Sequence, residues 1–139
     1  MREILFRGQK PDTKEWVYGS LLESSDGRKA IVVKNKGFIQ KQSSAWLIDA
    51  PCYDIIPESV GQFTGKLDSH KIKIFVGDIV SMDNDFEDPE ISEVKYAQGG
   101  FIVEADFGDY DMTTIGWAIE LMTEVKVIGN IHDNPELIK

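Results

Sequence analysis

The side chains that most often carry enzyme chemistry are scarce in this chain of 139 residues, which has one cysteine and two histidines. A Cys–His pair is formally available, as Cys52 with either His70 or His132. A cysteine becomes a strong nucleophile beside positive charge or at a helix N-terminus, and no basic cluster adjoins Cys52 in sequence. We therefore interpret Cys52 as a small, partly buried hydrophobic residue and expect no catalytic residue in this chain.

Metal sites are not expected either. A structural zinc site needs about four Cys or His ligands, and the three in this chain lie far apart. Residues 83–88 resemble the start of a calcium-binding loop, but Asp88 stands where that loop needs glycine and Val94 where it needs glutamate. A second acidic group binds a hard cation only weakly and is better interpreted as a solvated loop. Its members are Asp106, Asp109 and Asp111. We expect no metal, no cofactor and no enzymatic activity.

Charge is distributed unevenly along the chain. Residues 1–73 carry twelve Lys and Arg against nine Asp and Glu, a net of about +3. Residues 74–139 carry three against fifteen, a net of about −12, and the whole chain has a formal charge of −9. Phosphate backbones repel so acidic a half, so we do not expect it to bind duplex DNA. Three interpretations stay open: head-to-tail self-association, docking on a basic partner, or a solvated acidic face.

The basic residues of the first half define a candidate interaction surface. Its members are Lys29, Lys34, Lys36, Phe38 and Lys41. Lysines with an aromatic side chain can bind single-stranded nucleic acid. On the solvent face of a hairpin, however, lysines also protect an edge strand from pairing with another chain. We favour edge protection and keep nucleic-acid binding as the alternative.

The elements that must position these residues are predicted to be short antiparallel strands, because turn signals separate β-branched and aromatic runs. Asp26-Gly27 predicts a tight hairpin, and so does Gln98-Gly99-Gly100. Asn35-Lys36-Gly37 is expected to turn the chain back into another strand. Prolines at both ends place residues 52–56 at a sheet edge. The predicted strands are 16–22, 28–33, 38–40, 60–65, 71–76, 79–82, 91–97, 101–105 and 124–131.

Helix is expected to be sparse. Residues 113–122 have a helical apolar stripe that Gly116 and Trp117 blur, so a strand stays open as the alternative there. Asn134-Pro135 marks the start of a single turn. The fold class is therefore mainly β, and we expect an N-terminal β-hairpin region at 1–57 and a second β region at 58–139. Two groups of side chains are expected in the core: the isoleucines Ile79 and Ile128, and the tryptophans Trp16, Trp46 and Trp117.

Three blocks of sequence resemble the YopX family. They are residues 1–8 with 16–19, residues 60–65 leading to 74–80, and residues 127–137, and they follow the family's order over nearly the whole chain. The resemblance implies a protein encoded by a bacteriophage or prophage, with an SH3-like small barrel in the C-terminal region and a short tail. It implies no activity and no catalytic residues. The chain departs from the family at Leu67-Asp68-Ser69-His70, where an Asn-Gly or similar turn is usual.

These observations predict a non-enzymatic interaction or assembly protein that self-associates, with a host or phage protein as a further possible partner. The alternative is a nucleic-acid-related role: single-strand binding through the basic hairpin, or DNA mimicry by the acidic half. Because the chain has one cysteine, no signal peptide and no apolar run of about 20 residues, we expect a location in the cytoplasm of the bacterial host and no membrane contact.

Overall fold

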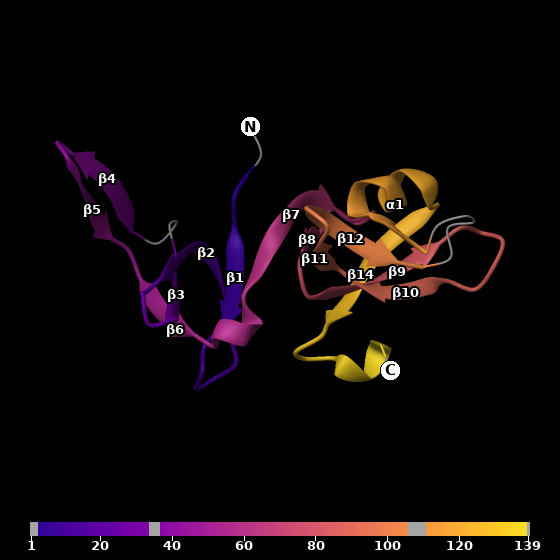
Figure 1. Cartoon of the computed structure of the whole chain (residues 1–139), viewed down its shortest axis with the longest axis horizontal. Coiled ribbons are helices and arrows are strands. Elements are labelled where there is room, and N and C mark those ends of the chain that lie inside the picture. The colour runs from indigo at the N-terminus through magenta and orange to yellow at the C-terminus, as the bar shows by residue number, and fades with distance from the viewer. Residues whose placement is uncertain (1–2, 34–36, 106–110, 139) are drawn as a thin grey trace. The chain divides into compact units, whose positions relative to one another are not determined.

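The computed structural model describes residues 3–33, 37–105 and 111–138. The chain divides into two compact units, Met1–Gln62 and Phe63–Lys139. Both units are built mainly from short antiparallel strands, so the predicted fold class is confirmed (Figure 1). Within the described ranges, no helix is both long and apolar enough to cross a membrane.

The main sheet of the first unit joins four strands in the order β6-β3-β2-β1. Asp26-Gly27 forms the predicted turn between β2 and β3, and Gly27 has the positive φ of 91° that such a turn needs. The proline-flanked strand β6 lies at the sheet edge, as predicted. Val17, Ile31 and Ile55 are the centre of the core on one face. The strands are β1 (Phe6–Gln9), β2 (Trp16–Glu23), β3 (Lys29–Val32) and β6 (Cys52–Ile55).

A separate hairpin of two strands, β4 (Phe38–Gln42) and β5 (Ala45–Asp49), is inserted between β3 and β6. The predicted strand 38–40 covers part of β4, whereas β5 was not predicted. The predicted turn into β4 lies partly outside the described residues, which exclude Asn35 and Lys36. The hairpin extends away from β3 and β6 of its own unit (Figure 1).

Strand β7 (Gly61–Leu67) begins in the first unit, where Gly61 and Gln62 pair with β1, and continues into the second, where it pairs with β8 (Lys73–Phe75). Two three-stranded sheets follow, in the orders β10-β9-β14 and β11-β12-β13. The first contains β9 (Asp78–Asp83), β10 (Glu90–Glu93) and β14 (Glu124–Asn130). The second contains β11 (Lys95–Ala97), β12 (Gly100–Glu104) and β13 (Met112–Thr114).

The core of the second unit lies between these sheets and the helix α1 (Ile115–Leu121). It contains Ile74, Val80, Met82, Val94, Val103, Ile115, Ala118 and Val125. The predicted strand 91–97 is broken at Val94, which is fully buried and whose N–H donates to the carbonyl of Asp78 at 2.8 Å. The sheets do not close into a barrel within the part of the chain that the structure describes, so the SH3-like barrel is not confirmed.

One core prediction is right and one is wrong. Ile79 is fully buried, but Ile128 is only half-buried. The register between β14 and β9 shifts between Val127 and Gly129, so Ile128 has no partner in β9. A bulge of this kind turns a side chain away from the regular alternation that the prediction assumed.

The departure from the family pattern at residues 67–70 is a turn held by a buried carboxylate. Asp68 is 4% exposed. Its Oδ1 accepts hydrogen bonds from the N–H groups of His70 (2.8 Å) and Ile72 (2.9 Å). Its Oδ2 accepts one from Val127 (3.0 Å), which ties the turn to β14. Burial opposes ionisation of Asp68, but these three donors and the neighbouring His70 outweigh it and lower its pKa.

Candidate interaction surface

The structure separates the residues predicted to form the interaction surface. Lys29 lies on β3 in the main sheet of the first unit, whereas Phe38 and Lys41 lie on β4 in the separate hairpin. Lys34 and Lys36 lie outside the described residues. The described part of this surface therefore consists of the main sheet around Lys29 and the hairpin around Lys41.

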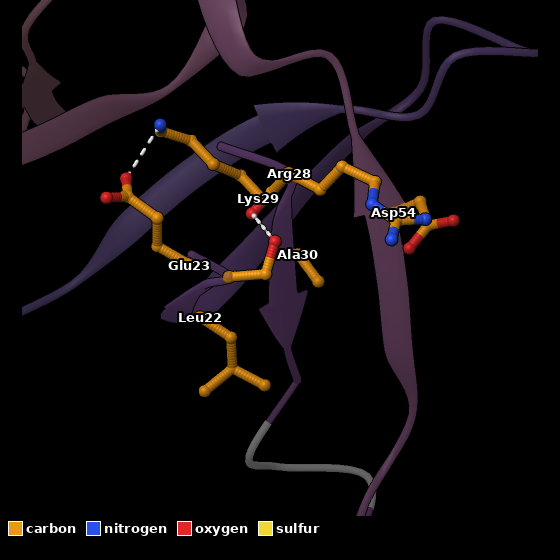
Figure 2. Close-up of a pocket in the computed structure, with 7 residues that line it drawn as sticks. Leu22, Glu23, Arg28, Lys29, Ala30 and Asp54 are labelled. Carbon is orange, nitrogen blue, oxygen red and sulfur yellow. Dashed lines mark hydrogen bonds and ion pairs between the residues drawn. The ribbon is translucent and has the colours of Figure 1, made fainter. Parts of the chain in front are cut away.

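Lys29 and Arg28, the positively charged side chains at this part of the main sheet, form ion pairs with neighbouring acidic side chains. Lys29 Nζ lies 2.7 Å from Glu23 Oε2, and Arg28 Nε lies 2.9 Å from Asp26 Oδ2. Lys29 and Arg28 line an open hollow of about 440 Å³, together with Glu23 and Asp54 (Figure 2). Because the lining mixes both signs, this hollow is not a concentrated anion site.

The two strands of the β4–β5 hairpin pair in a regular register. Its strands pair from Phe38 opposite Asp49 to Gln42 opposite Ala45, and Ser43 in the connecting turn has a φ of +54°. At the base, a Cβ on Gly37 would clash with the carbonyl oxygen of Asp49. Only glycine therefore allows the two ends of the hairpin to approach as they do.

Apolar side chains of this hairpin are exposed to solvent. Side chains alternate along a strand and residues directly opposite share a face, so Ile39 and Lys41 lie on the same face as Trp46 and Ile48. Trp46 is 64% exposed and Ile48 is 49% exposed. Leu47, on the other face, is 41% exposed. The hairpin thus presents apolar side chains to solvent on both faces, with Lys41 directly opposite Trp46.

The hairpin also lies in the most basic stretch of the chain. Residues 27–48 contain five Lys and Arg and no Asp or Glu, in a protein whose net charge is −9. Of these five, Lys41 lies on the hairpin itself, and Asp49 stands at the hairpin's other end. We call Ile39, Lys41, Trp46 and Ile48 the hairpin face.

None of the three tryptophans is among the buried core residues, contrary to the sequence prediction. Trp16 is half-buried on β2. Trp46 lies on the hairpin, and Trp117 is 61% exposed on α1, two positions after the buried Ile115. The signal that was missed for Trp46 is the pair of serines at 43–44, which separates two β-prone segments as a two-residue hairpin turn does.

The side chains considered for enzyme chemistry lie on different elements, and each can be described by its own surroundings. Cys52 is exposed, so its predicted partial burial is wrong. His70 Nε2 lies 3.5 Å from Glu124 Oε2 near the surface. Among the described residues, no three His, Cys, Asp or Glu side chains are grouped to hold a metal ion. Asp106 and Asp109 lie outside those residues. The buried Asp78 accepts a hydrogen bond from the N–H of Phe75 at 2.8 Å, which is a structural role.

The fold and this surface define a class: a small β protein of two units, with a hairpin inserted in the first that exposes apolar side chains beside Lys41. The sequence profile of the YopX protein family matches residues 5–139, so the chain belongs to that family.

Among known proteins, the SPbeta prophage-derived uncharacterized protein YopX of Bacillus subtilis (strain 168) is 40% identical to the chain over 58 residues. That match covers 40% of this chain and 42% of the relative, so it spans less than half of the relative's length.

Two solved structures share the fold over almost their whole length. Protein EF1440 from Enterococcus faecalis aligns with a TM-score of 0.71 and 26% identity, covering 100% of both chains. Protein yopX from Bacillus subtilis aligns with a TM-score of 0.62 and 24% identity, covering 97% of this chain and 98% of that one. This chain therefore shares its fold with both of these proteins.

Proposed function

We propose that this protein is a non-enzymatic interaction protein of a bacteriophage or prophage, that it self-associates, and that the β4–β5 hairpin is its docking element. The prophage origin of the Bacillus subtilis relative supports the phage assignment. The setting proposed is the cytoplasm of the bacterial host. The observation that carries the proposal is the hairpin face, where Trp46 and Ile48 are exposed on an isolated pair of strands.

The energetics of the hairpin support docking. An isolated two-stranded hairpin is only marginally stable in water. Complete burial of a large apolar side chain is worth about 1.5–3 kcal/mol relative to leaving it exposed. Covering Trp46 and Ile48 therefore stabilises both the hairpin and a complex that contains it. Nothing in this reasoning requires a catalytic group.

The charge distribution supports a second copy of the chain as the partner. Residues 27–48 contain five Lys and Arg and no Asp or Glu, and Lys41 among them lies on the hairpin face. Residues 74–139 carry a net of about −12. Opposite surface charges on two partners speed their encounter and fix their orientation. Each copy carries both kinds of surface, so copies of the chain are complementary to one another. Salt should weaken the association, since these charges are exposed.

Sedimentation of the full chain over a range of concentrations tests the proposal. We expect a species heavier than the 15.7 kDa monomer, weakened by raising the salt. Trp46→Ser should shift the chain to monomer. Trp117→Ser is the matched control, since Trp117 is 61% exposed against 64% for Trp46. A wild-type chain that stays monomeric at high concentration, whatever the salt, would refute self-association.

A second candidate function is binding of single-stranded nucleic acid. Lys41 opposite the exposed Trp46 combines a cation with an aromatic surface, as single-strand-binding proteins do. Quenching of tryptophan fluorescence by an oligonucleotide at low salt, lost in Trp46→Ser, would favour this candidate. The acidic half could instead act as a DNA mimic, which would appear as competition with DNA for a nucleic-acid-binding protein. A chain that neither retains DNA nor competes with it would eliminate both forms.

A further inference from the structure

We propose that the hairpin face of one copy docks on the tip of the β9–β10 hairpin of another copy. We call this tip, residues 83–93, the acidic tip. The inference rests on the proposed function, because it names the surface that receives the hairpin. It commits to one occupant, a second copy of this chain.

The acidic tip combines negative charge with an exposed aromatic side chain. Residues 83–93 contain six Asp and Glu and no Lys or Arg. Phe86 near its centre is 91% exposed, the highest value among the large apolar side chains that the structure describes, and Ile91 is 46% exposed. A phenylalanine presented this fully to water, surrounded by carboxylates, is a surface that a basic and apolar partner would cover.

Local hydrogen bonds hold this tip in a defined shape. Asn84 Oδ1 accepts hydrogen bonds from the N–H groups of Phe86 (3.0 Å) and Glu87 (3.1 Å), and Asp83 Oδ1 accepts one from Asp85 (2.9 Å). Side-chain oxygens that bond to the backbone two or three residues later pre-form a turn. The turn presents Phe86 outward, and a pre-formed turn reduces the entropy that docking must overcome.

The two surfaces are opposite in charge, and both expose apolar side chains. The hairpin face offers Lys41 with Trp46 and Ile48, and the acidic tip offers carboxylates with Phe86 and Ile91. Aromatic side chains such as Trp and Phe are enriched at the centres of protein interfaces. The exposed Trp117 on α1 is a poorer receptor, because Lys66 lies against Gly116 beside it and adds positive charge.

Such an interface joins two different surfaces, so it is heterologous. Each copy then keeps one free hairpin face and one free acidic tip, and association continues until a ring closes or a chain of copies forms. This property supplies a decisive test, because damage to opposite surfaces in two variants leaves one intact pair of surfaces when the variants are mixed.

The test uses two full-length variants. The hairpin variant is Lys41→Glu with Trp46→Ser, and the tip variant is Asp85→Lys with Phe86→Ser and Glu87→Lys. All five side chains are exposed, so both variants should keep the wild-type far-ultraviolet circular dichroism. We expect each variant alone to be monomeric in sedimentation, with the dissociation constant raised about thirtyfold or more, as for central aromatic contacts. A 1:1 mixture should form a discrete heterodimer and nothing larger.

The outcomes separate this inference from the proposed function. If the tip variant associates like the wild type while the hairpin variant does not, the acidic tip is not the receptor, and self-association through the hairpin stands. If both variants are monomeric and their mixture stays monomeric, the pairing of these two surfaces is refuted. If the wild type never associates, both proposals fail.

Glu120→Lys with Glu136→Lys is the charge control for the tip variant. It makes the same change of charge on exposed residues outside the tip, and it should associate like the wild type.

Discussion

Replacing Asp68 tests whether the turn that departs from the family pattern is held by its carboxylate. Asp68→Ala removes the acceptor for three backbone N–H groups, those of His70, Ile72 and Val127. A hydrogen bond to a charged group contributes about 1.5–3 kcal/mol. Water can reach some of the released donors because all three bonds are only partly buried, so we expect a total loss of about 2–4 kcal/mol. Asp68→Asn keeps one acceptor oxygen and should lose about half as much.

The effect should depend on pH with a definite sign. The pKa of Asp68 in the folded protein lies below its ordinary value of 3.8. The carboxylate therefore contributes its full stabilisation above about pH 4, and loses it as the pH falls through the lowered folded pKa. The difference in unfolding free energy between wild type and Asp68→Asn should be constant near neutrality and shrink in acid below that point.

Hydrogen exchange followed during urea titration is the appropriate assay, because the chain has two units and a single global transition need not describe both. Peptides covering β14 report the unit that contains Asp68 and include the N–H of Val127. Asp12→Ala is the control, since Asp12 accepts only a local, exposed hydrogen bond from the next residue, Thr13, and should change stability by less than about 0.5 kcal/mol. A loss below about 1 kcal/mol for Asp68→Ala, or a difference that persists unchanged into acid, would refute the reasoning.

Two further predictions concern the second unit. Ile79→Ala should cost about 2–5 kcal/mol, because Ile79 is fully buried, whereas Ile128→Ala should cost less than about 1.5 kcal/mol. If both substitutions lower the free energy of unfolding in urea by the same amount, the bulge does not turn Ile128 away from the core. Gly129→Ala places a Cβ 2.6 Å from Asn134 Oδ1, which accepts the N–H of Asn130, so exchange at that N–H should become faster. Unchanged exchange would show that the Asn134 side chain moves aside without cost.

The sequence predicts the fold where local signals are strong. The Asp26-Gly27 and Gln98-Gly99 turns specify their hairpins, because Gly27 and Gly99 have a positive φ, which only glycine or a few polar residues adopt easily. The strands that were missed have weaker signals. Strand β13 has only three residues, and β5 opens with Ala-Trp-Leu-Ile, an apolar run without the alternation that marks a half-buried strand.

The candidate site was predicted only in part, for a physical reason. Basic residues near Phe38 indicated the right segment. The local sequence does not show, however, whether an acidic side chain from a neighbouring strand lies beside a given lysine. Lys29 has Glu23 beside it only because β2 and β3 pair in that register, whereas Lys41 lies opposite Trp46. Which role a lysine has is therefore decided by strand register, which short sequence patterns do not specify.

The exposed tryptophan on the hairpin is the feature that distinguishes function from stability here. A side chain that stabilises the monomer should lie in a core, as Ile31 and Ile79 do with no exposed surface. Trp46 instead lies on an element whose base depends on a glycine at position 37 and whose turn carries a serine with positive φ. These are costs of holding a fixed, exposed apolar hairpin. On the docking role proposed above, the compensating gain comes from covering the hairpin face, so we expect Trp46→Ser to abolish association while leaving unfolding of the second unit unchanged.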